Sequence, residues 1–497
     1  MNNVNTISQT NGNYHKKSVN ILANNQNIAF EEAGIKSKLL TLNQPCYVVK
    51  VNGEIGFTNQ FNASEQIELL CALPPLTLQQ LGDRSFLEFH NVKYAYSAGA
   101  MAGGIASEEL VIAFGKAGIL ASFGAGGLSR ERVESAIKQI QQVLPNGPYA
   151  FNLLHSPSEP TMERGSVDLY LQYGVRTVEA SAFLDITPNI VYYRAAGLSL
   201  NSNNQIEINN KVIAKVSRRE VASKFMAPAP VKMLQELVEQ GLISELQKEL
   251  AQKVPIADDI TVEADSGGHT DNRPLVCLLP AILELRDEIQ QKYYYTNPVR
   301  IGVAGGIATP QSALAAFMMG AAYVVTGSIN QSCVEAGTSD YTKKLLAQAQ
   351  MTDVTMAPAA DMFEMGVKLQ VLKRGTLFGM RAQLLYDLYQ RYDSIEDIPV
   401  SEREKLEKQV FKQSLDSIWS STQEYLSQRR PHKLERANKN AKFKMALIFR
   451  WYLGLSSRWS NSGEKGRETD YQIWCGPAMG AFNNWVKDSY LAQAQNR

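Results

Sequence analysis

Short apolar runs alternate with helical patterns from about residue 93 to residue 328. Eight of the runs are short and apolar, as buried strands are. They cover residues 93–98, 118–123, 149–154, 176–181, 212–217, 260–264, 300–304 and 322–326. Strands that alternate with helices indicate a parallel sheet. Eight such units over roughly 250 residues predict an α/β fold, a (β/α)8 TIM barrel.

The helical segments between these strands carry recognisable start signals. Ser129 precedes one helical pattern, and Thr309-Pro310 precedes another, as an N-cap followed by Pro at the first helical position. Residues 198–210 interrupt the alternation and read as an inserted loop or hairpin. An open doubly wound sheet is the competing architecture. It is disfavoured because the glycines that begin at Gly124 lack the GxGxxG spacing of a dinucleotide-binding turn.

Four further segments flank the barrel, which we place at residues 91–330. Residues 1–30 are rich in Asn, Gln and Ser and are expected to be disordered. Residues 31–90 are expected to form a small cap, with a hairpin turn at Asn52-Gly53. Residues 331–465 read as an added helical region. Residues 466–497 are glycine-rich and aromatic, and we expect them to pack back on the barrel.

Composition narrows the class of protein. With 50 basic and 49 acidic residues, the chain lacks the charge excess of a nucleic-acid-binding protein. No apolar run is long enough to cross a bilayer, and residues 1–17 lack the apolar core of a signal peptide. The five cysteines form no CxxC pair, so neither a disulfide framework nor a metal site is indicated. A cytoplasmic protein without a metal is expected.

Two successive glycine turns, after the seventh and eighth strands, predict a phosphate site. In barrels these loops often bind phosphate through backbone N–H groups. The residues expected to contribute are Gly305, Gly306, Ile307, Thr326, Gly327 and Ser328. Such a site suits a phosphosugar barrel and a flavin barrel equally.

Small residues after the first strand favour the flavin. The stretch YSAGAMAGGIA offers bare backbone around Ala100, with Met101 as a soft contact for the edge of a ring. Asn152 ends the third strand and has an amide able to pair with a ring edge. Lys215 ends the fifth strand, where its positive charge would favour an anionic reduced flavin.

The segment EADSGGHTDNRP, after the sixth strand, carries the candidate catalytic residue. Gly267 and Gly268 remove side chains from the turn, so backbone can approach a flat or anionic ligand. His269 follows at once and is one of only five histidines in the chain. Asp265 is expected either beside the cofactor or as a cap of the turn.

The order AMAGGIAS, FGAGGLS, FNLL, ADSGGH, AGGIATP and TGS resembles the FMN-dependent nitronate monooxygenase and enoyl-reductase superfamily. The stretches LGDRSFLEFHNVKYAYSAGAMAGGIASEELV, EADSGGHTDNRP and WCGPAMGAFNNWV resemble its PfaD family more closely. Those are trans-acting enoyl reductases of polyunsaturated fatty acid and polyketide synthases. The resemblance implies FMN as cofactor, NADPH as diffusible hydride donor and an enoyl thioester on an acyl carrier protein as substrate. It also implies that His269 is the active-site histidine.

Two other functions remain open on these residues. A nitronate monooxygenase-like oxidase would use the same barrel, with His269 as base, and a non-catalytic assembly component would keep only the fold. The basic stretch of residues 429–450 is expected either to be a solvated face or to dock an acidic carrier protein, which favours the reductase. The sequence leaves homo-oligomerisation open.

Overall fold

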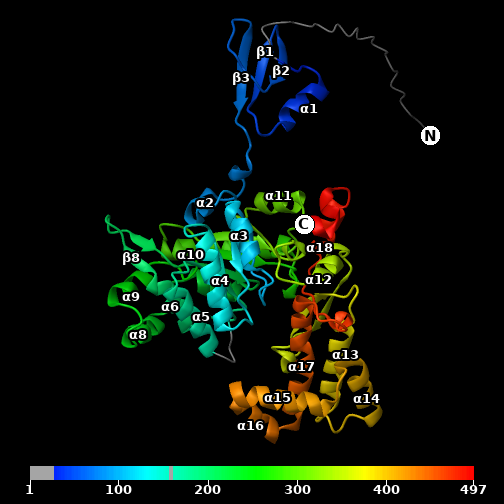
Figure 1. The fold of residues 1–497 in the computed structure, drawn as a ribbon. Helices are drawn as coiled ribbons and strands as arrows, with labels where there is room; N and C mark the ends of the chain where they lie inside the picture. Colours follow the sequence, from blue (N-terminus) through cyan, green and yellow to red (C-terminus); the bar gives the residue numbers. More distant parts are fainter. Residues whose placement is uncertain (1–26, 156–159) are drawn as a thin grey trace, which may run out of the picture. The chain divides into compact units, whose positions relative to one another are not determined.

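The computed structural model describes residues 27–155 and 160–497 and divides into two compact units, Met1–Gln80 and Leu81–Arg497 (Figure 1). The segment expected to be disordered, residues 1–30, lies mostly outside the described residues. Within its described end, Ala29 forms a β-bridge with Phe57. The ordered part of the first unit therefore begins before residue 31.

The first unit is a helix, α1 (Glu32–Leu40), and a three-stranded antiparallel sheet in the order β2-β1-β3. The strands are β1 (Cys46–Val51), β2 (Glu54–Thr58) and β3 (Ile67–Leu73). The hairpin predicted at Asn52-Gly53 is confirmed, because Val51 pairs with Glu54 and both turn residues have positive φ. The boundary predicted at residue 90 is wrong. The unit ends at Gln80, since the next helix packs on the barrel.

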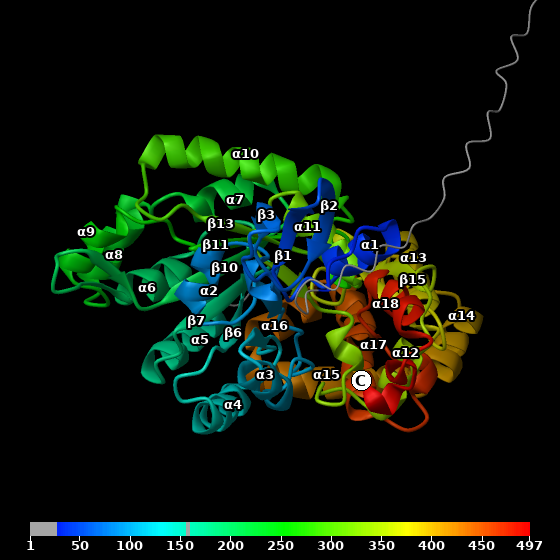
Figure 2. The same cartoon turned by 90° about the horizontal axis from the view of Figure 1, so that it is seen from above.

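The second unit contains the predicted closed parallel barrel, with strand order β10-β11-β13-β14-β4-β5-β6-β7 (Figure 2). All eight predicted strands are present. They are β4 (Tyr96–Ala98), β5 (Leu120–Phe123), β6 (Ala150–Leu154), β7 (Thr177–Ser181), β10 (Lys211–Val216), β11 (Asp259–Glu263), β13 (Arg300–Ala304) and β14 (Val324–Thr326). The doubly wound alternative is thereby excluded.

Helices surround this barrel, and the predicted caps are confirmed: the hydroxyls of Ser129 and Thr309 accept backbone N–H bonds at their helix starts. The helices are α2 (Arg84–His90), α3 (Glu108–Lys116), α4 (Arg130–Val143), α5 (Pro160–Gln172), α6 (Pro188–Ala196), α7 (Arg219–Met226), α8 (Val231–Glu239), α9 (Glu245–Ala251), α10 (Leu275–Tyr293) and α11 (Pro310–Met318). The predicted insertion is a hairpin of β8 (Leu198–Leu200) and β9 (Ile206–Ile208).

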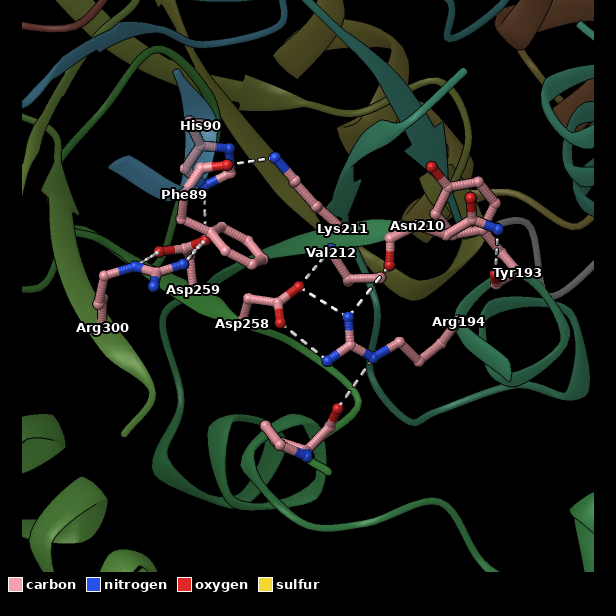
Figure 3. A network of polar contacts seen from close by, with 11 residues as sticks. Phe89, His90, Tyr193, Arg194, Asn210, Lys211, Val212, Asp258, Asp259 and Arg300 are labelled. Atoms are coloured by element: carbon pink, nitrogen blue, oxygen red, sulfur yellow. Dashed lines mark hydrogen bonds and ion pairs between the residues drawn. The ribbon is translucent and has the colours of Figure 1, made fainter. Parts of the chain in front are cut away.

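Buried charges close the amino-terminal end of the barrel (Figure 3). Asp259, at the start of β11, accepts two bonds from Arg300 and one from His90, the last residue of α2. Beside it, Asp258 accepts two bonds from Arg194. Burial alone would raise the pKa of Asp259, but Arg300 and His90 outweigh it and hold that pKa at about 2. This network ties α2 to the barrel.

Residues 331–465 are less helical than predicted. Two short strands, β15 (Val354–Pro358) and β16 (Lys368–Leu372), lie among their helices. The local patterns VTMAP and KLQVL are too short to mark strands by period alone. They pair with each other, and β16 also pairs with residues 268 and 269, which are distant in sequence. The helices are α12 (Asp340–Ala347), α13 (Phe378–Arg391), α14 (Val400–Lys405), α15 (Leu415–Arg429), α16 (Pro431–Lys439) and α17 (Ala441–Ser462), with a π-helix at Leu406–Phe411 and with α18 (Ala478–Val486) after them.

The added strands continue into the loop that follows β11. Gly268–His269 forms a two-residue strand, β12, in a sheet of order β12-β16-β15. Gly268 pairs with Gln370 and His269 with Leu369. The histidine singled out from the sequence is therefore held by the added region as well as by the barrel. No helix in the described ranges is long and apolar enough to span a membrane.

Candidate active site

The loop after β13 offers open backbone at the carboxyl end of the barrel. Gly305 and Gly306 both have positive φ, +86° and +74°, which side chains rarely adopt. A Cβ at Gly305 would lie 2.7 Å from the carbonyl carbon of Ala264, so this glycine lets the loop pack on the end of β11. A Cβ at Gly306 would meet nothing within 4 Å. The side chain of Ile307 is buried in the core, which leaves only its backbone for a ligand.

In the loop after β14, the Thr326 hydroxyl bonds within the protein, whereas the Ser328 hydroxyl can still donate to a ligand. The hydroxyl of Thr326 lies 2.7 Å from the Tyr96 hydroxyl and 3.0 Å from the Asn330 amide nitrogen, so it holds the loop together. A contact between Thr326 and a phosphate stays a prediction. The Ser328 hydroxyl oxygen accepts the N–H of Gly476 at 3.0 Å and keeps its own proton to donate. A Cβ at Gly327 would meet nothing within 4 Å.

Four backbone N–H groups gather on these two loops: those of Gly306, Ile307, Gly327 and Ser328. Strands β13 and β14 are neighbours in the barrel, so the loops lie side by side. Within the described residues, none of the four N–H groups has a hydrogen-bond acceptor in the protein. Converging backbone donors of this kind form an anion-binding concavity. The pair of loops therefore has the backbone donors that the predicted phosphate site requires, and we call it the phosphate cradle.

The small-residue turn after β4 is shaped by backbone packing. The N–H of Ala100 donates to the Glu179 carboxylate at 3.2 and 3.3 Å. A Cβ at Gly124 would lie 1.7 Å from the carbonyl oxygen of Met101, so the turn rests directly on the loop after β5. The missing side chain of Gly124 thus makes room for this contact. Ala100 and Met101 remain half-buried at the mouth of the barrel.

Asn152 is buried near the end of β6, and the nitrogen of its side-chain amide is hydrogen-bonded within the protein. Its Nδ2 donates to the Glu179 carbonyl and to the Ser181 hydroxyl, both at 3.0 Å. Its Oδ1 has no donor among the described residues and can accept an N–H from a ligand.

Lys215 lies between two carboxylates. Its Nζ is 3.2 Å from Glu263 and 3.9 Å from Glu179, and all three side chains are mostly buried. Burial lowers the pKa of Lys215, but the two carboxylates outweigh it and raise that pKa. Lys215 therefore carries its positive charge beside two anions, and its expected effect on a reduced flavin stays a prediction.

Asp265 connects the loop after β11 to the added region. Its Oδ1 accepts bonds from Gln370 Nε2 and Asn272 Nδ2, each at 2.8 Å. Of the two roles expected for Asp265, these contacts support the structural one. A direct contact with a cofactor stays a prediction.

The two glycines before His269 lie against the C-terminal segment. A Cβ at Gly267 would lie 2.8 Å from the nitrogen of Cys475 and 2.9 Å from that of Gly476, so the C-terminal segment crosses this loop at close range. Gly268 has a φ of +78°, and its Cβ position lies 3.9 Å from the ring of Trp474. The approach of a flat ligand to the backbone of Gly267 stays a prediction. The missing side chain of this glycine makes room for residues 475 and 476.

His269 is partly exposed and has one carboxylate partner. Its Nε2 lies 3.2 Å from Oδ1 of Asp361, and 42% of its side chain is accessible. Burial lowers the pKa of His269, but the hydrogen bond and charge of Asp361, with the charge of Glu263, outweigh it and raise that pKa. The raised pKa favours the protonated form of the ring.

The predicted residues fall at the carboxyl ends of β4, β6, β10, β11, β13 and β14, which is one mouth of the barrel. Sequence reasoning missed five neighbours: Glu179, Glu263, Asp361, Gln370 and Trp474. The two glutamates carried a signal, because Glu179 lies inside the strand TVEAS and Glu263 ends the strand DITVE. The other three come from distant segments and had none. No group of metal-binding side chains occurs in the part of the chain that is described.

Comparisons with known proteins agree with this architecture. A family model described as nitronate monooxygenase matches residues 84–382. The N-terminal domain of the fatty acid synthase subunit PfaD matches residues 23–75, and the inserted helical domain of [acyl-carrier-protein] S-malonyltransferase matches residues 392–471. The fold and site thus define a barrel of the nitronate monooxygenase type. The chain belongs to the PfaD family within this group.

Individual relatives support the assignment. The enoyl reductase domain of MlnA, from the macrolactin cluster of Bacillus amyloliquefaciens, is 40% identical with a TM-score of 0.81, over 85% of this chain and 94% of that one. A polyunsaturated fatty acid synthase subunit from Thraustochytrium sp. is 50% identical over 94% of this chain and 31% of its own length. Polyketide biosynthesis protein PksE of Bacillus subtilis is 48% identical over 85% of this chain and 55% of its own length. The chain thus spans about a third to a half of the length of these two.

Proposed function

We propose that the protein is a trans-acting enoyl reductase. It reduces the α,β-double bond of enoyl thioesters on an acyl carrier protein during polyketide or polyunsaturated fatty acid biosynthesis. The observation that carries the proposal is the phosphate cradle at one barrel mouth, together with the Asp361-paired His269 on the loop after β11. The likeness to the MlnA enoyl reductase domain supports the choice of substrate.

The cradle fits the phosphate of FMN. Its four open N–H groups would hold the phosphate oxygens, and the Ser328 hydroxyl can add a fifth donor. The open Oδ1 of Asn152 can accept an N–H from the ring. Bound FMN would take hydride from NADPH and supply it to the β-carbon of the substrate. NADPH acts here as a diffusible hydride donor. This role suits a sequence that lacks the GxGxxG fingerprint of a dinucleotide-binding domain.

His269 supplies the proton in this reaction. Asp361 accepts the Nε2–H of the imidazolium, which leaves Nδ1–H to donate to the thioester oxygen or the α-carbon as negative charge develops there. The raised pKa of His269 favours this acid role over the base role that a nitronate oxidase needs. The oxidase remains the second candidate, because the nitronate monooxygenase model covers the whole barrel.

Part of the basic stretch 429–450 suits an acidic carrier protein. Lys442, Lys444 and Arg450 are paired with carboxylates of the added region. Arg436 and Lys439, by contrast, are exposed on α16. We assign carrier docking to this exposed face, where exposed charges steer association and salt weakens it.

One set of assays separates the candidates. The purified protein should show a flavin spectrum and oxidise NADPH when given a carrier-bound 2-enoyl thioester. Oxygen uptake with a nitronate, without enoyl reduction, would establish the oxidase instead. A protein that remains colourless after incubation with FMN would point to a non-catalytic component.

A further inference from the structure

The loop between β15 and β16 places one carboxylate beside the histidine of the barrel loop. Asp361 and His269 are 92 residues apart in sequence, and their side chains meet at 3.2 Å. Asp361 follows β15, and the added region contributes it entirely. Its Oδ1 also accepts the N–H of Met362 at 3.1 Å, which fixes the carboxylate against its own backbone.

Sheet register explains why the two side chains meet. His269 pairs with Leu369 of β16, and Leu369 pairs with Ala357 of β15. The β15–β16 connection therefore begins beside β12. Phe363, which is fully buried, anchors this connection, and Gly366 turns it with a φ of +71°. Asp361 thus sits on a short, anchored loop.

Few other charges face the His269 ring. Glu263, at the end of β11, raises the pKa of the ring, and Lys215, at the end of β10, lowers it. The C-terminal segment that crosses this loop contributes Trp474 and Cys475, which are uncharged at neutral pH.

The acidic groups on the same loop as His269 are engaged elsewhere. Asp265 accepts bonds from Gln370 and Asn272, and Asp271 is paired with Arg218. Asp361 is therefore the carboxylate that acts directly on the ring.

We propose that Asp361 is a positioning residue for proton donation: it orients the His269 ring with Nδ1 free and stabilises the imidazolium. The proposal deepens the enoyl reductase assignment and rests on it for the reaction. In structural terms, we propose that the added region supplies part of the reaction centre. Without β15, β16 and the loop between them, His269 would lose its strand pairing with Leu369 and its hydrogen bond to Asp361.

The test compares Asp361→Asn and Asp361→Glu with Asp393→Asn, which makes the same charge change at an exposed site of the added region. Imidazole titration by NMR follows His269 directly, with its signal assigned by its loss in His269→Gln. We expect Asp361→Asn to lower the pKa of His269, Asp361→Glu to restore much of the shift, and Asp393→Asn to leave it unchanged. An unchanged titration in Asp361→Asn would overturn the proposal.

Enoyl reduction gives the second readout. The fall of kcat at high pH should move to lower pH in Asp361→Asn, while FMN content and the KM for NADPH stay unchanged. A shifted titration with an unmoved kcat profile would overturn the role of Asp361 in the reaction. If the titration shifts but the wild-type protein shows no enoyl reduction, the Asp361–His269 interaction is established and the proposed function fails.

Discussion

At the scale of single residues, the site contrasts two ways of placing charge. Lys215 is enclosed by Glu179 and Glu263 and is largely neutralised within the protein. His269 stands partly exposed with a single carboxylate partner, so it can exchange its proton with a substrate. Lys215 and its two carboxylates set the local electrostatic potential at this end of the barrel. His269 is the group that we propose for proton transfer.

Replacing His269 by Gln should leave FMN binding intact, because the cradle lies on other loops. Loss of the proton donor should lower kcat roughly 100-fold or more. Stopped-flow reduction by NADPH should stay normal while transfer to the enoyl substrate slows. Equal slowing of both half-reactions would contradict the assignment.

In the wild-type protein the pKa of His269 is raised, so its imidazolium persists above the usual value of about 6.5. Turnover should accordingly be constant at acid pH and fall as pH rises through that raised value.

At the scale of elements, the residues that matter for function and stability lie at the two ends of the barrel strands. The carboxyl ends hold the mouth, and the amino ends hold the buried network of Asp259, Arg300 and His90. A buried ion pair that loses one partner is costly, because the remaining charge is left in an apolar site. The amino-terminal end of the barrel therefore concerns stability rather than chemistry.

Arg300→Met should lower the free energy of unfolding by about 3–5 kcal/mol. Arg84→Met removes an exposed pair with Glu88 on α2 and should cost at most about 1 kcal/mol. Urea denaturation at neutral pH measures both, and equal effects would contradict the role of the buried network.

Acid should weaken the same network. Asp259 is ionised in the fold down to about pH 2, so its contribution is full above an unfolded pKa of about 3.9 and is lost as pH falls towards 2. Burial lowers the pKa of His90, so protonation of the unfolded chain below about pH 6.5 also favours unfolding. Both groups make stability decline with acid, and Arg300→Met should flatten the decline attributed to Asp259.

A second prediction at this scale concerns the contact between Gly267 and the C-terminal segment. Gly267→Ala would push against the backbone of residues 475 and 476 and should cost roughly 1–3 kcal/mol, with loss of turnover. Gly165→Ala, in helix α5 with nothing within 4 Å, should instead stabilise by roughly 0.5–1 kcal/mol. Thermal unfolding and turnover of the two variants make the comparison.

Sequence patterns predicted the barrel because each strand is a local apolar run with turn formers at its ends. They also located the carboxyl-end loops, where glycine and small residues cluster. They missed β15 and β16, whose five-residue patterns gain meaning only by pairing with each other and with residue 268. Asp361 has no local signal at all, since its role depends on a contact 92 residues away.

At the scale of the whole molecule, the barrel unit and its added region share one site, while α16 presents charge to the outside. Arg436→Glu with Lys439→Glu should raise the KM for a carrier-bound enoyl substrate several-fold at low salt. Activity on a small pantetheine thioester should not change. Lys116→Glu with Lys253→Glu, exposed on or next to helices around the barrel, is the matched control. Equal effects of the two pairs would reflect net charge rather than docking.

The bond between Gly476 and Ser328 also sets an order of events during synthesis. The two residues are 148 positions apart, and a ribosome needs roughly 7–30 s to cover that distance. All eight barrel strands have been translated before that interval begins. The nascent chain can therefore close its barrel well before residues 474–476 exist to cover the loop of His269. The loop of His269 is therefore complete only after residues 474–476 have been translated.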